Sequence, residues 1–334
     1  MATLIEVNDG ETTYKGLMSI AKDIAYFTAE EVKKRAKQGA LGKDLGKKGI
    51  TGDRMKSGDE IADDIIAEIL PGYFRQGIGP AYVYSEEKGV YILGEGNKGF
   101  FVIVDPVDGS NNMRKGAPHP SVSVSAALGK MSDLPGNGTF DAVSIGVVRD
   151  IFNNRAYHAV KGRGFADVYD ILDKETAELR TYDDDPAKIS VKTETRLEKA
   201  VLGIDLDKGK DENPEEMDAR LKKLSELMQN KLCQRRLGSS ILDFCKVAAG
   251  EYDGFISIGG RMKLHDLAAA KLIVEEAGGV FDVSGGYDGN LVNYMFSNLD
   301  RVDEVNQVLK RSKFKVIAAA NPFIYKHIKE CVDF

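Results

Sequence analysis

Short apolar runs rich in aromatic and β-branched residues follow one another between residues 81 and 148. Turn residues separate these runs, which is typical of successive β-strands. The runs are AYVY (81–84), VYIL (90–93), GFFVIV (99–104), SVSVSAAL (121–128) and AVSIGVV (142–148). This stretch therefore predicts a β-sheet at the centre of the first half of the chain.

Two amphipathic helices are expected before these strands. From Glu11 to about Lys37, apolar residues recur at helical spacing among lysines and glutamates. The second helix is EIADDIIAEIL, which follows Asp59, and we expect Pro71-Gly72 to stop it because proline lacks the backbone donor of a helix interior. The glycine- and lysine-rich stretch between the helices, residues 40–60, is expected to be a loop.

Strands and helices alternate in the second half of the chain. The strand-like runs are VLGIDL (201–206), GFISI (254–258) and FKVIAAA (314–320), and the helical ones lie near 214–229, 240–249, 267–277 and from about Pro322. Such alternation indicates an α/β layer. It places a boundary near Lys188, with an N-terminal α+β domain at 1–188 and a C-terminal α/β domain at 189–334. The polar stretch at 166–190 is expected to be a solvated surface insertion.

Charge and cysteine content narrow the class of protein. The net charge of −6 argues against a general nucleic-acid binder, which needs a cationic surface. Three widely spaced cysteines argue against a disulfide framework and fit a reducing cytosol. No apolar run approaches the ~18 residues that span a bilayer, and the first residues lack the features of a signal peptide. We therefore expect a soluble, cytoplasmic protein without a membrane partner.

Acidic residues end several of the apolar runs. Glu86 and Glu87 follow AYVYS, and FFVIV leads directly into the sequence DPVDGS at 105–110. A further acid, Asp266, opens the predicted helix LAAAKLIVEEAGG. Each has an ordinary structural explanation, because acids and glycine are common in turns and aspartate commonly caps a helix.

The DPVDGS segment also supports a functional interpretation. Pro106 stiffens the turn, and Asp105 and Asp108 are spaced to converge on one point. Mg²⁺ prefers several oxygen ligands from rigid carboxylates. Gly109 and Ser110 then offer backbone amides and a hydroxyl where a phosphate can sit. Carboxylates beside such amides describe a site for metal-assisted phosphoryl transfer.

These segments resemble the signatures of the inositol monophosphatase family. DPVDGSNN at 105–112 resembles its D-P-[IL]-D-G-[TS] signature. HDLAAAKLIVEEAGG at 265–279 is similar to its second signature, with His265 where tryptophan is usual. SEEKG at 85–89 resembles the family's G-E-E segment. Two long motifs in the right order make the resemblance specific.

Further matches extend the resemblance. Lys48, Asp53 and Asp59 have the spacing of the family's K-x4-D-x5-D stretch. GAPHPSVSVS at 116–125 and the closing A-N-P are typical of archaeal-type members. Those members often act on both inositol monophosphate and fructose 1,6-bisphosphate.

The resemblance implies a site with two or three Mg²⁺ ions. The metal ligands that it implies are Glu86, Asp105, the Val107 carbonyl, Asp108 and Asp266. Catalytic roles would fall to Glu86, Ser110 and Asp108, and the attack of water on phosphorus would be in line and direct. The amides of Gly109 and Ser110 would bind the phosphate. Glu87 and Lys48 would steady the ligands and water from a second layer.

Basic residues near the second signature are candidates for substrate contact. The pocket glutamate of the animal inositol enzymes would fall near Ser257 here, amid an insertion of two residues, and Arg261 and Lys263 lie nearby instead. They can form an ordinary solvated turn or contact a substrate phosphate. Arg235 and Arg236, which precede a turn containing Ser240, can add to that contact. These residues favour an enzyme that accepts a bisphosphate as well as inositol phosphate.

The sequence also bears on other possible functions. Gly94–Gly99 matches GxGxxG, but a strand follows where a dinucleotide site needs a helix, so we expect a hairpin turn. Three functions stay open: an Mg²⁺-dependent sugar or cyclitol phosphatase, a phosphatase of 3′-phosphorylated adenosine nucleotides, and a catalytically idle relative that binds or regulates a partner.

The family resemblance also implies the architecture. It predicts the layered αβαβα sandwich of the sugar phosphatase superfamily, which combines α+β and α/β parts. The site would lie in the cleft between those parts. The implied substrate is a small phosphorylated sugar or cyclitol, and the implied assembly is a homodimer or a larger homo-oligomer.

Overall fold

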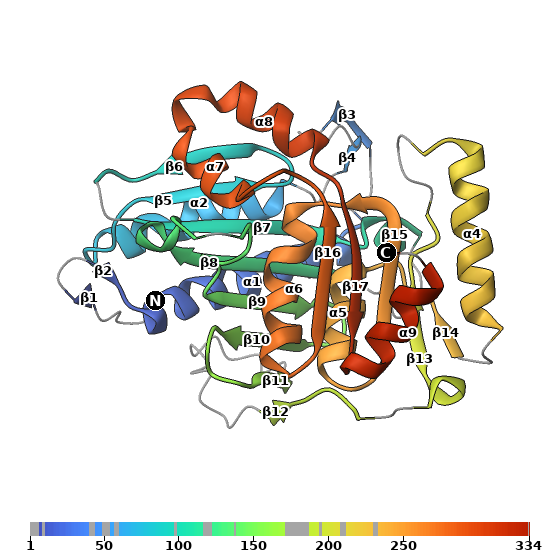
Figure 1. The fold of residues 1–334 in the computed structure, drawn as a ribbon. Coiled ribbons are helices and arrows are strands. Elements are labelled where there is room, and N and C mark those ends of the chain that lie inside the picture. Colours follow the sequence, from blue (N-terminus) through green and yellow to red (C-terminus); the bar gives the residue numbers. More distant parts are fainter. Residues whose placement is uncertain are drawn as a thin grey trace.

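A computed structural model describes most of the chain. The described residues are 7–8, 11–39, 44–48, 54–56, 60–96, 99–115, 122–136, 138–170, 187–193, 196–207, 212–229, 233–332 and 334. Two large sheets form its centre (Figure 1). None of the helices within these ranges has the length and apolar character needed to cross a membrane.

The first sheet has eight strands in the order β12-β11-β10-β9-β8-β7-β5-β6. Neighbouring strands are antiparallel except β5 and β7, which are parallel. The strands are β5 (Ala81–Ser85), β6 (Gly89–Leu93), β7 (Phe100–Asp108), β8 (Ser123–Lys130), β9 (Ile145–Asp150), β10 (Arg155–Val160), β11 (Ala166–Asp170) and β12 (Ala187–Ile189).

The second sheet has five strands in the order β14-β13-β15-β17-β16. Here β13 runs parallel to both β14 and β15, and the other neighbours are antiparallel. The strands are β13 (Val201–Ile204), β14 (Cys233–Arg235), β15 (Gly254–Met262), β16 (Val280–Gly285) and β17 (Phe314–Ala319). Two small ladders pair β1 (Val7–Asn8) with β2 (Glu11–Thr12) and β3 (Asp44–Lys48) with β4 (Arg54–Lys56).

The helices complete five layers, which confirms the predicted αβαβα sandwich. Helices α1 and α2 cover one face of the first sheet, α5 and α6 lie between the sheets, and α4 and α9 cover the far face of the second (Figure 1). The helices are α1 (Tyr14–Lys37), α2 (Ile61–Phe74), α3 (Ser110–Lys115), α4 (Pro214–Met228), α5 (Ser240–Ala248), α6 (Leu264–Glu276), α7 (Leu291–Ser297), α8 (Val302–Arg311) and α9 (Pro322–Val332).

Helix α6 is apolar around most of its circumference because it lies between two sheets. Small residues let it approach the first sheet closely: a Cβ added to Gly146 on β9 would lie 2.8 Å from the Ala269 carbonyl oxygen. The largest core cluster draws on both sheets through this layer. The division of the chain into domains 1–188 and 189–334 stays a prediction.

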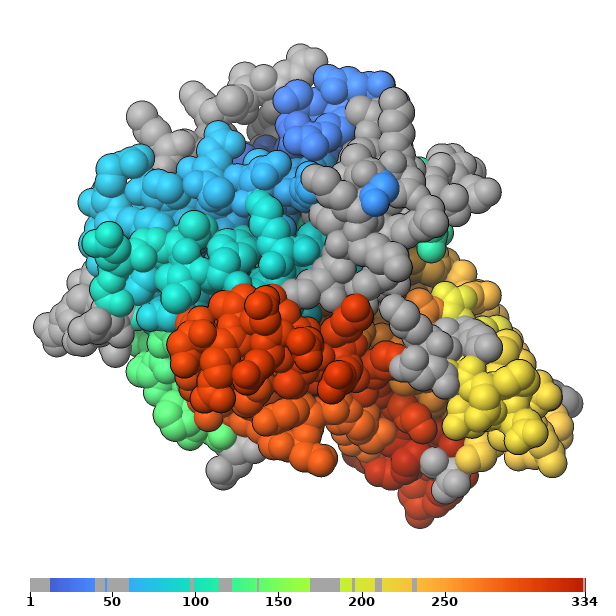
Figure 2. Space-filling model, turned by 90° about the horizontal axis from the view of Figure 1, so that it is seen from above, coloured from blue at the N-terminus to red at the C-terminus, as the bar shows by residue number. Residues whose placement is uncertain are grey.

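Helix α8 extends the contact between the two halves. It packs on β6, and the Asn306 side-chain oxygen accepts a hydrogen bond from the Val90 amide at 3.4 Å. From above, the orange α8 region adjoins the cyan β5–β6 region (Figure 2). The two parts of the chain are thus joined on the surface as well as in the core.

Four expectations about elements were wrong. Helix α2 continues through Pro71 to Phe74, since the proline removes a single helical donor while buried Leu70 and Tyr73 hold the last turn against the core. The stretch at 40–60 contains the β3–β4 ladder rather than loop alone.

The other two corrections concern the first sheet. Residues 166–170 form β11, where the buried Asp167 pairs with His158 of β10 at 3.1 Å, so a polar stretch was mistaken for surface. The GEGNKG segment is not a hairpin turn, because it joins β6 to β7 and these lie on opposite sides of β5. The remainder of the 166–190 insertion up to residue 186, and Asp53 and Asp59, lie outside the described residues.

Candidate functional site

Acidic residues from separate segments meet at one edge of the first sheet. Strands β5 and β7 are parallel, with Ser85 opposite Val104, so their carboxyl ends reach the same edge. Glu86 and Asp105 are the next residues along the two strands. Their carboxylates therefore project from neighbouring positions.

A β-bulge brings Asp108 to the same edge. Asp105 pairs with Ser125 and Asp108 with Ser123, so β7 uses three steps where β8 uses two. Residues three apart in a regular strand face opposite sides, and the extra residue removes that difference. Pro106 suits this position because it has no amide for the ladder. Asp105 Oδ1 accepts a hydrogen bond from the Val107 amide at 3.0 Å.

The start of α6 supplies two further groups. Asp266 is the third residue of the helix rather than its N-cap, and its Oδ2 accepts a hydrogen bond from the Lys263 amide at 2.6 Å. His265 Nε2 lies 3.7 Å from Asp266 Oδ1 and 3.8 Å from Glu86 Oε1. One ligand atom each from Glu86, Asp105 and His265 lies within 4.8 Å of the others. We call Glu86, Asp105, Asp108, His265 and Asp266 the acidic cluster.

The start of α5 fixes the position of Asp108. Asp108 Oδ2 accepts hydrogen bonds from Ser239 Oγ at 2.7 Å and from the Ile241 amide at 2.9 Å. Ser239 is fully buried and is the N-cap of α5. Asp108 of the first sheet is thereby tied to a helix that lies between the sheets.

Burial, together with neighbouring charges, raises the pKa values of three carboxyl groups in the acidic cluster. Burial, followed by the charges of Glu86, Asp108 and Asp266, raises the pKa of Asp105 well above its usual range. Burial and the charge of Asp266 raise the pKa of Asp108 to about 7. Burial also raises the pKa of Asp266 to about 6. Such a group of carboxylates is costly without a cation, and oxygen ligands of this kind fit a hard divalent cation.

The turn after Asp108 is held in place by contacts with the second half of the chain. Gly109 has φ 90°, a conformation that favours glycine, and Ser110 begins the short helix α3. The Asn112 side-chain amide donates a hydrogen bond to the Leu237 carbonyl at 2.7 Å. The turn that carries Gly109 and Ser110 is therefore tied, through Asn112, to the segment that precedes α5.

The predicted substrate-contact residues divide into two groups. Arg261 lies 2.5 Å from Asp207 and 3.7 Å from Asp205, and Arg236 also pairs with Asp207. Arg236 and Arg261 therefore lie close together because both pair with Asp207, an acid that was not among the predicted site residues.

The remaining predicted contact residues have hydrogen-bond partners of other kinds. Lys263 Nζ donates hydrogen bonds to the carbonyls of Lys310 and Ser312, at 2.6 and 3.3 Å, at the end of α8. Arg235 Nη1 contacts Cys233 Sγ at 2.8 Å and the Gln234 carbonyl at 2.9 Å on its own strand. Ser240 is half-buried and follows Ser239, the serine that binds Asp108.

The second layer includes a residue that sequence reasoning missed. Asp63 of α2 is buried, and it accepts hydrogen bonds from Ser85 Oγ at 2.8 Å and Tyr91 Oη at 2.7 Å. It thereby anchors the end of β5 just before Glu86. Its position on the buried face of α2, between Ala62 and Ile66, was a signal available in the sequence.

The two predicted second-layer residues are located less fully. The Glu87 amide donates a hydrogen bond to Ser85 Oγ at 3.3 Å, which places Glu87 in the turn beside Glu86. Lys48 ends β3, and its side chain lies outside the described part of the chain.

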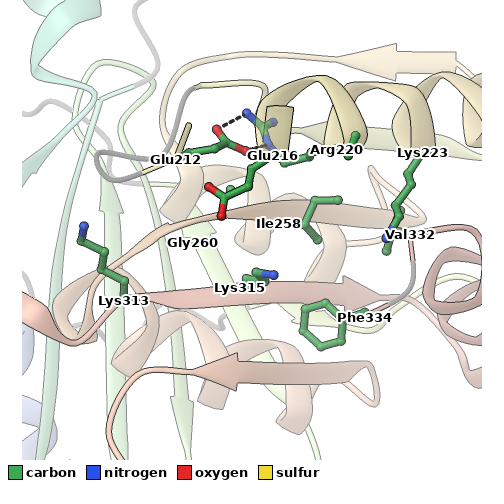
Figure 3. A pocket seen from close by; sticks show the side chains of 12 residues that line it. Glu212, Glu216, Arg220, Lys223, Ile258, Gly260, Lys313, Lys315, Val332 and Phe334 are labelled. Atoms are coloured by element: carbon green, nitrogen blue, oxygen red, sulfur yellow. Dashed lines mark hydrogen bonds and ion pairs between the residues drawn. The ribbon is translucent and has the colours of Figure 1, made fainter. Parts of the chain in front are cut away.

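A separate pocket of about 430 Å³ lies on the far side of the second sheet (Figure 3). Residues from α4, β15, β17 and the C-terminal end line it. Within it Arg220 pairs with Glu212 at 2.6 Å, and Lys313 and Lys315 point along its lower wall. No member of the acidic cluster lines this pocket. The acidic cluster and the pocket are therefore separate places on the molecule, and we take the acidic cluster as the candidate site.

Known proteins are similar to this chain in sequence and in fold. Residues 13–321 match the profile of the inositol monophosphatase family. A fructose-1,6-bisphosphatase/inositol-1-monophosphatase of Methanothermobacter thermautotrophicus is 29% identical over 278 residues, which cover 81% of this chain and 88% of that protein. A bifunctional NADP phosphatase/NAD kinase of Methanococcus maripaludis is 28% identical over 236 residues, 68% of this chain and 37% of that protein.

Among solved structures, the extragenic suppressor protein suhB of Bartonella henselae has a similar fold. Its TM-score is 0.64 at 23% identity, and the match covers 95% of this chain and 98% of that protein. At this identity the likeness concerns the fold, and it extends over nearly the whole length of both chains.

Proposed function

We propose that this chain, which belongs to the inositol monophosphatase family, is an Mg²⁺-dependent phosphatase of small phosphorylated sugars or cyclitols. Family membership supports hydrolysis of a phosphoric monoester. The narrower proposal names inositol monophosphate and fructose 1,6-bisphosphate as substrates. The observation that carries the proposal is the acidic cluster, where carboxylates from one sheet edge and from the start of α6 meet, and where burial raises the pKa values of Asp105, Asp108 and Asp266.

Two cations would be shared among the carboxylates. Glu86, Asp105 and the Val107 carbonyl would hold the first, Asp105, Asp108 and Asp266 the second, and a third position would adjoin Glu86. Bound divalent cations supply activation of water and neutralisation of phosphate charge. The residues of the chain then have separate tasks. Glu86 and Ser110 orient the attacking water, and the amides of Gly109 and Ser110 hold the phosphate in line with it.

A phosphate-release panel tests this function. The substrates are inositol 1-phosphate, fructose 1,6-bisphosphate, adenosine 3′,5′-bisphosphate and NADP, each with and without Mg²⁺. The proposal expects Mg²⁺-dependent release from one or both of the first two. Preference for a nucleotide would instead place the chain with the NADP phosphatase activity of the Methanococcus relative. Mg²⁺ binding without release from any substrate would favour an idle relative.

The metal assignment has its own test. Asp108→Asn keeps the size of the side chain and an acceptor for Ser239 and Ile241, but it removes one ligand charge. We expect turnover to fall by about 10³-fold or more, as is usual when a charge-stabilising group is lost. Asp288→Asn, at an exposed acid in a loop, is the control. Retained turnover in Asp108→Asn would exclude the assignment.

Arg236 and Arg261 are the best-placed groups for a second substrate phosphate. Both now pair with Asp207, and a substrate phosphate could take over one of these contacts. Arg261→Gln should lower kcat/KM for fructose 1,6-bisphosphate about tenfold or more and that for inositol 1-phosphate much less. Arg301→Gln, at an exposed site, is the matched control. Equal losses for both substrates would count against this role.

We also propose that the protein is a homodimer, as the family resemblance implies. Light scattering on the purified protein measures the mass directly, and a monomer at micromolar concentration would contradict the proposal.

A further inference from the structure

His265 differs from the usual family signature, in which tryptophan occupies this position. The buried His265 ring faces the same space as the carboxylates of Glu86 and Asp105. Indole has no lone pair in the ring plane to offer a cation, whereas neutral imidazole has one. The substitution therefore adds a donor type that the usual signature lacks.

We infer that His265 binds the first metal ion through Nε2, together with Glu86 and Asp105, and so shifts the preference of this site from Mg²⁺ toward Mn²⁺ and related transition metals. This inference rests on the proposed metal centre. It concerns the identity of one ligand and the class of cation that the site selects.

The distances around Nε2 fit shared coordination. Two ligands of one ion, each about 2.0–2.2 Å from it, lie at most about 4.4 Å apart. His265 Nε2 lies 3.8 Å from Glu86 Oε1 and 3.7 Å from Asp266 Oδ1. Both separations exceed the length of an N–H···O hydrogen bond. The separation between Nε2 and Glu86 Oε1 is within the span of two ligands of one ion, and Asp266, which would hold the second ion, lies equally near.

The other ring nitrogen is held in the manner of metal-binding histidines. His265 Nδ1 lies 3.1 Å from the hydroxyl of the buried Tyr84. When Nδ1–H donates to that oxygen, Nε2 presents its lone pair toward the carboxylates. Ser125 Oγ donates a hydrogen bond to the His265 carbonyl at 3.4 Å, which also fixes the backbone. The ring is therefore oriented before any cation arrives.

The mixed donor set determines the class of cation. Mg²⁺ strongly prefers oxygen ligands, whereas imidazole suits transition metals, and Mn²⁺ accepts carboxylates as well. A site with carboxylate oxygens and one imidazole nitrogen should bind Mn²⁺ more tightly than Mg²⁺. Removal of the nitrogen should reduce that difference.

Pulsed electron paramagnetic resonance of the full-length protein loaded with Mn²⁺ tests the ligand directly. We expect a nitrogen hyperfine coupling in the wild type and in the control His327→Gln, a histidine on α9. His265→Phe should lose that coupling. Isothermal titration should show that His265→Phe binds Mn²⁺ at least about tenfold more weakly, with a smaller loss for Mg²⁺.

The outcomes separate the two proposals. Mn²⁺ bound without nitrogen coupling in the wild type, or equal losses for both cations in His265→Phe, would overturn the role of His265 while leaving the metal centre intact. Failure of the wild type to bind either cation would overturn the metal centre and the inference together. If His265→Phe does not fold, loss of the coupling in His265→Gln, which keeps a polar side chain without an imidazole nitrogen, decides the question in its place.

Discussion

Replacement of Asp108 by asparagine should stabilise the metal-free protein, although the same change should abolish turnover. Burial and the charge of Asp266 raise the pKa of Asp108 to about 7, whereas the pKa of an aspartate in an unfolded chain is about 3.9. Above neutral pH the folded protein must carry this unfavourable charge. Asparagine occupies the same position without it.

The magnitude follows from the pKa difference. A difference of about 3 units, at about 1.4 kcal/mol per unit, makes ionised Asp108 unfavourable by up to about 4 kcal/mol in the folded state. Below about pH 4 the carboxyl is protonated in both states and this difference vanishes. The penalty grows as the pH rises from about 4 to about 7 and is constant above that. Because Asp266 shares the interaction, we expect a gain of about 1–4 kcal/mol at pH 8.

Thermal unfolding in the presence of a chelator measures this gain. For 334 residues, 1 kcal/mol corresponds to about 1.4 °C, so Asp108→Asn should raise Tm at pH 8 by about 1–6 °C. The gain should be clearly smaller at pH 5, and Asp288→Asn should show neither effect. An unchanged or lower Tm at pH 8, or an equal gain at both pH values, would refute the electrostatic reasoning.

Three other changes have defined outcomes. Saturating Mg²⁺, at about 100 times its Kd, should raise the free energy of unfolding of the wild type by about 2.7 kcal/mol, and an unchanged Tm on titration would exclude binding to the native state. Ser239→Ala removes a hydroxyl that donates to Asp108 at 2.7 Å, so calorimetry should show about 10–100-fold weaker Mg²⁺ binding; unaltered affinity would contradict this supporting role. Gly146→Ala places a Cβ 2.8 Å from the Ala269 carbonyl oxygen, so it should lower the free energy of unfolding in denaturant by about 1–3 kcal/mol. If the variant were as stable as the wild type, α6 could move away from the sheet at no cost.

The parts of the site that follow strands could be predicted from the sequence. Glu86 and Asp105 come directly after apolar runs, and local patterning is enough to place acids at strand ends. The hydrogen bonds of Ser239 and Ile241 to Asp108 depend on packing between segments 131 and 133 residues apart. Such contacts leave no periodic signal in one sequence.

Errors in the predicted fold have the same origin. Residues 166–170, ADVYD, begin the insertion that was predicted as polar surface, but Asp167 forms a buried cross-strand pair with His158 inside the sheet. Pro71 lies in a helix whose last turn is held by tertiary contacts rather than by propensity. In both places long-range packing outweighed the local preference of the residues.

The position of β17 has a consequence for synthesis of the protein on the ribosome. This strand, Phe314–Ala319, lies inside the second sheet, between β15 and β16, although it is nearly the last element of the sequence. Strand β15 leads directly into the start of α6, which carries His265 and Asp266. A nascent chain that has not yet released β17 therefore lacks the neighbour that aligns this connection. A chain that stalls before β17 emerges from the ribosome should therefore neither capture metal nor hydrolyse its substrate.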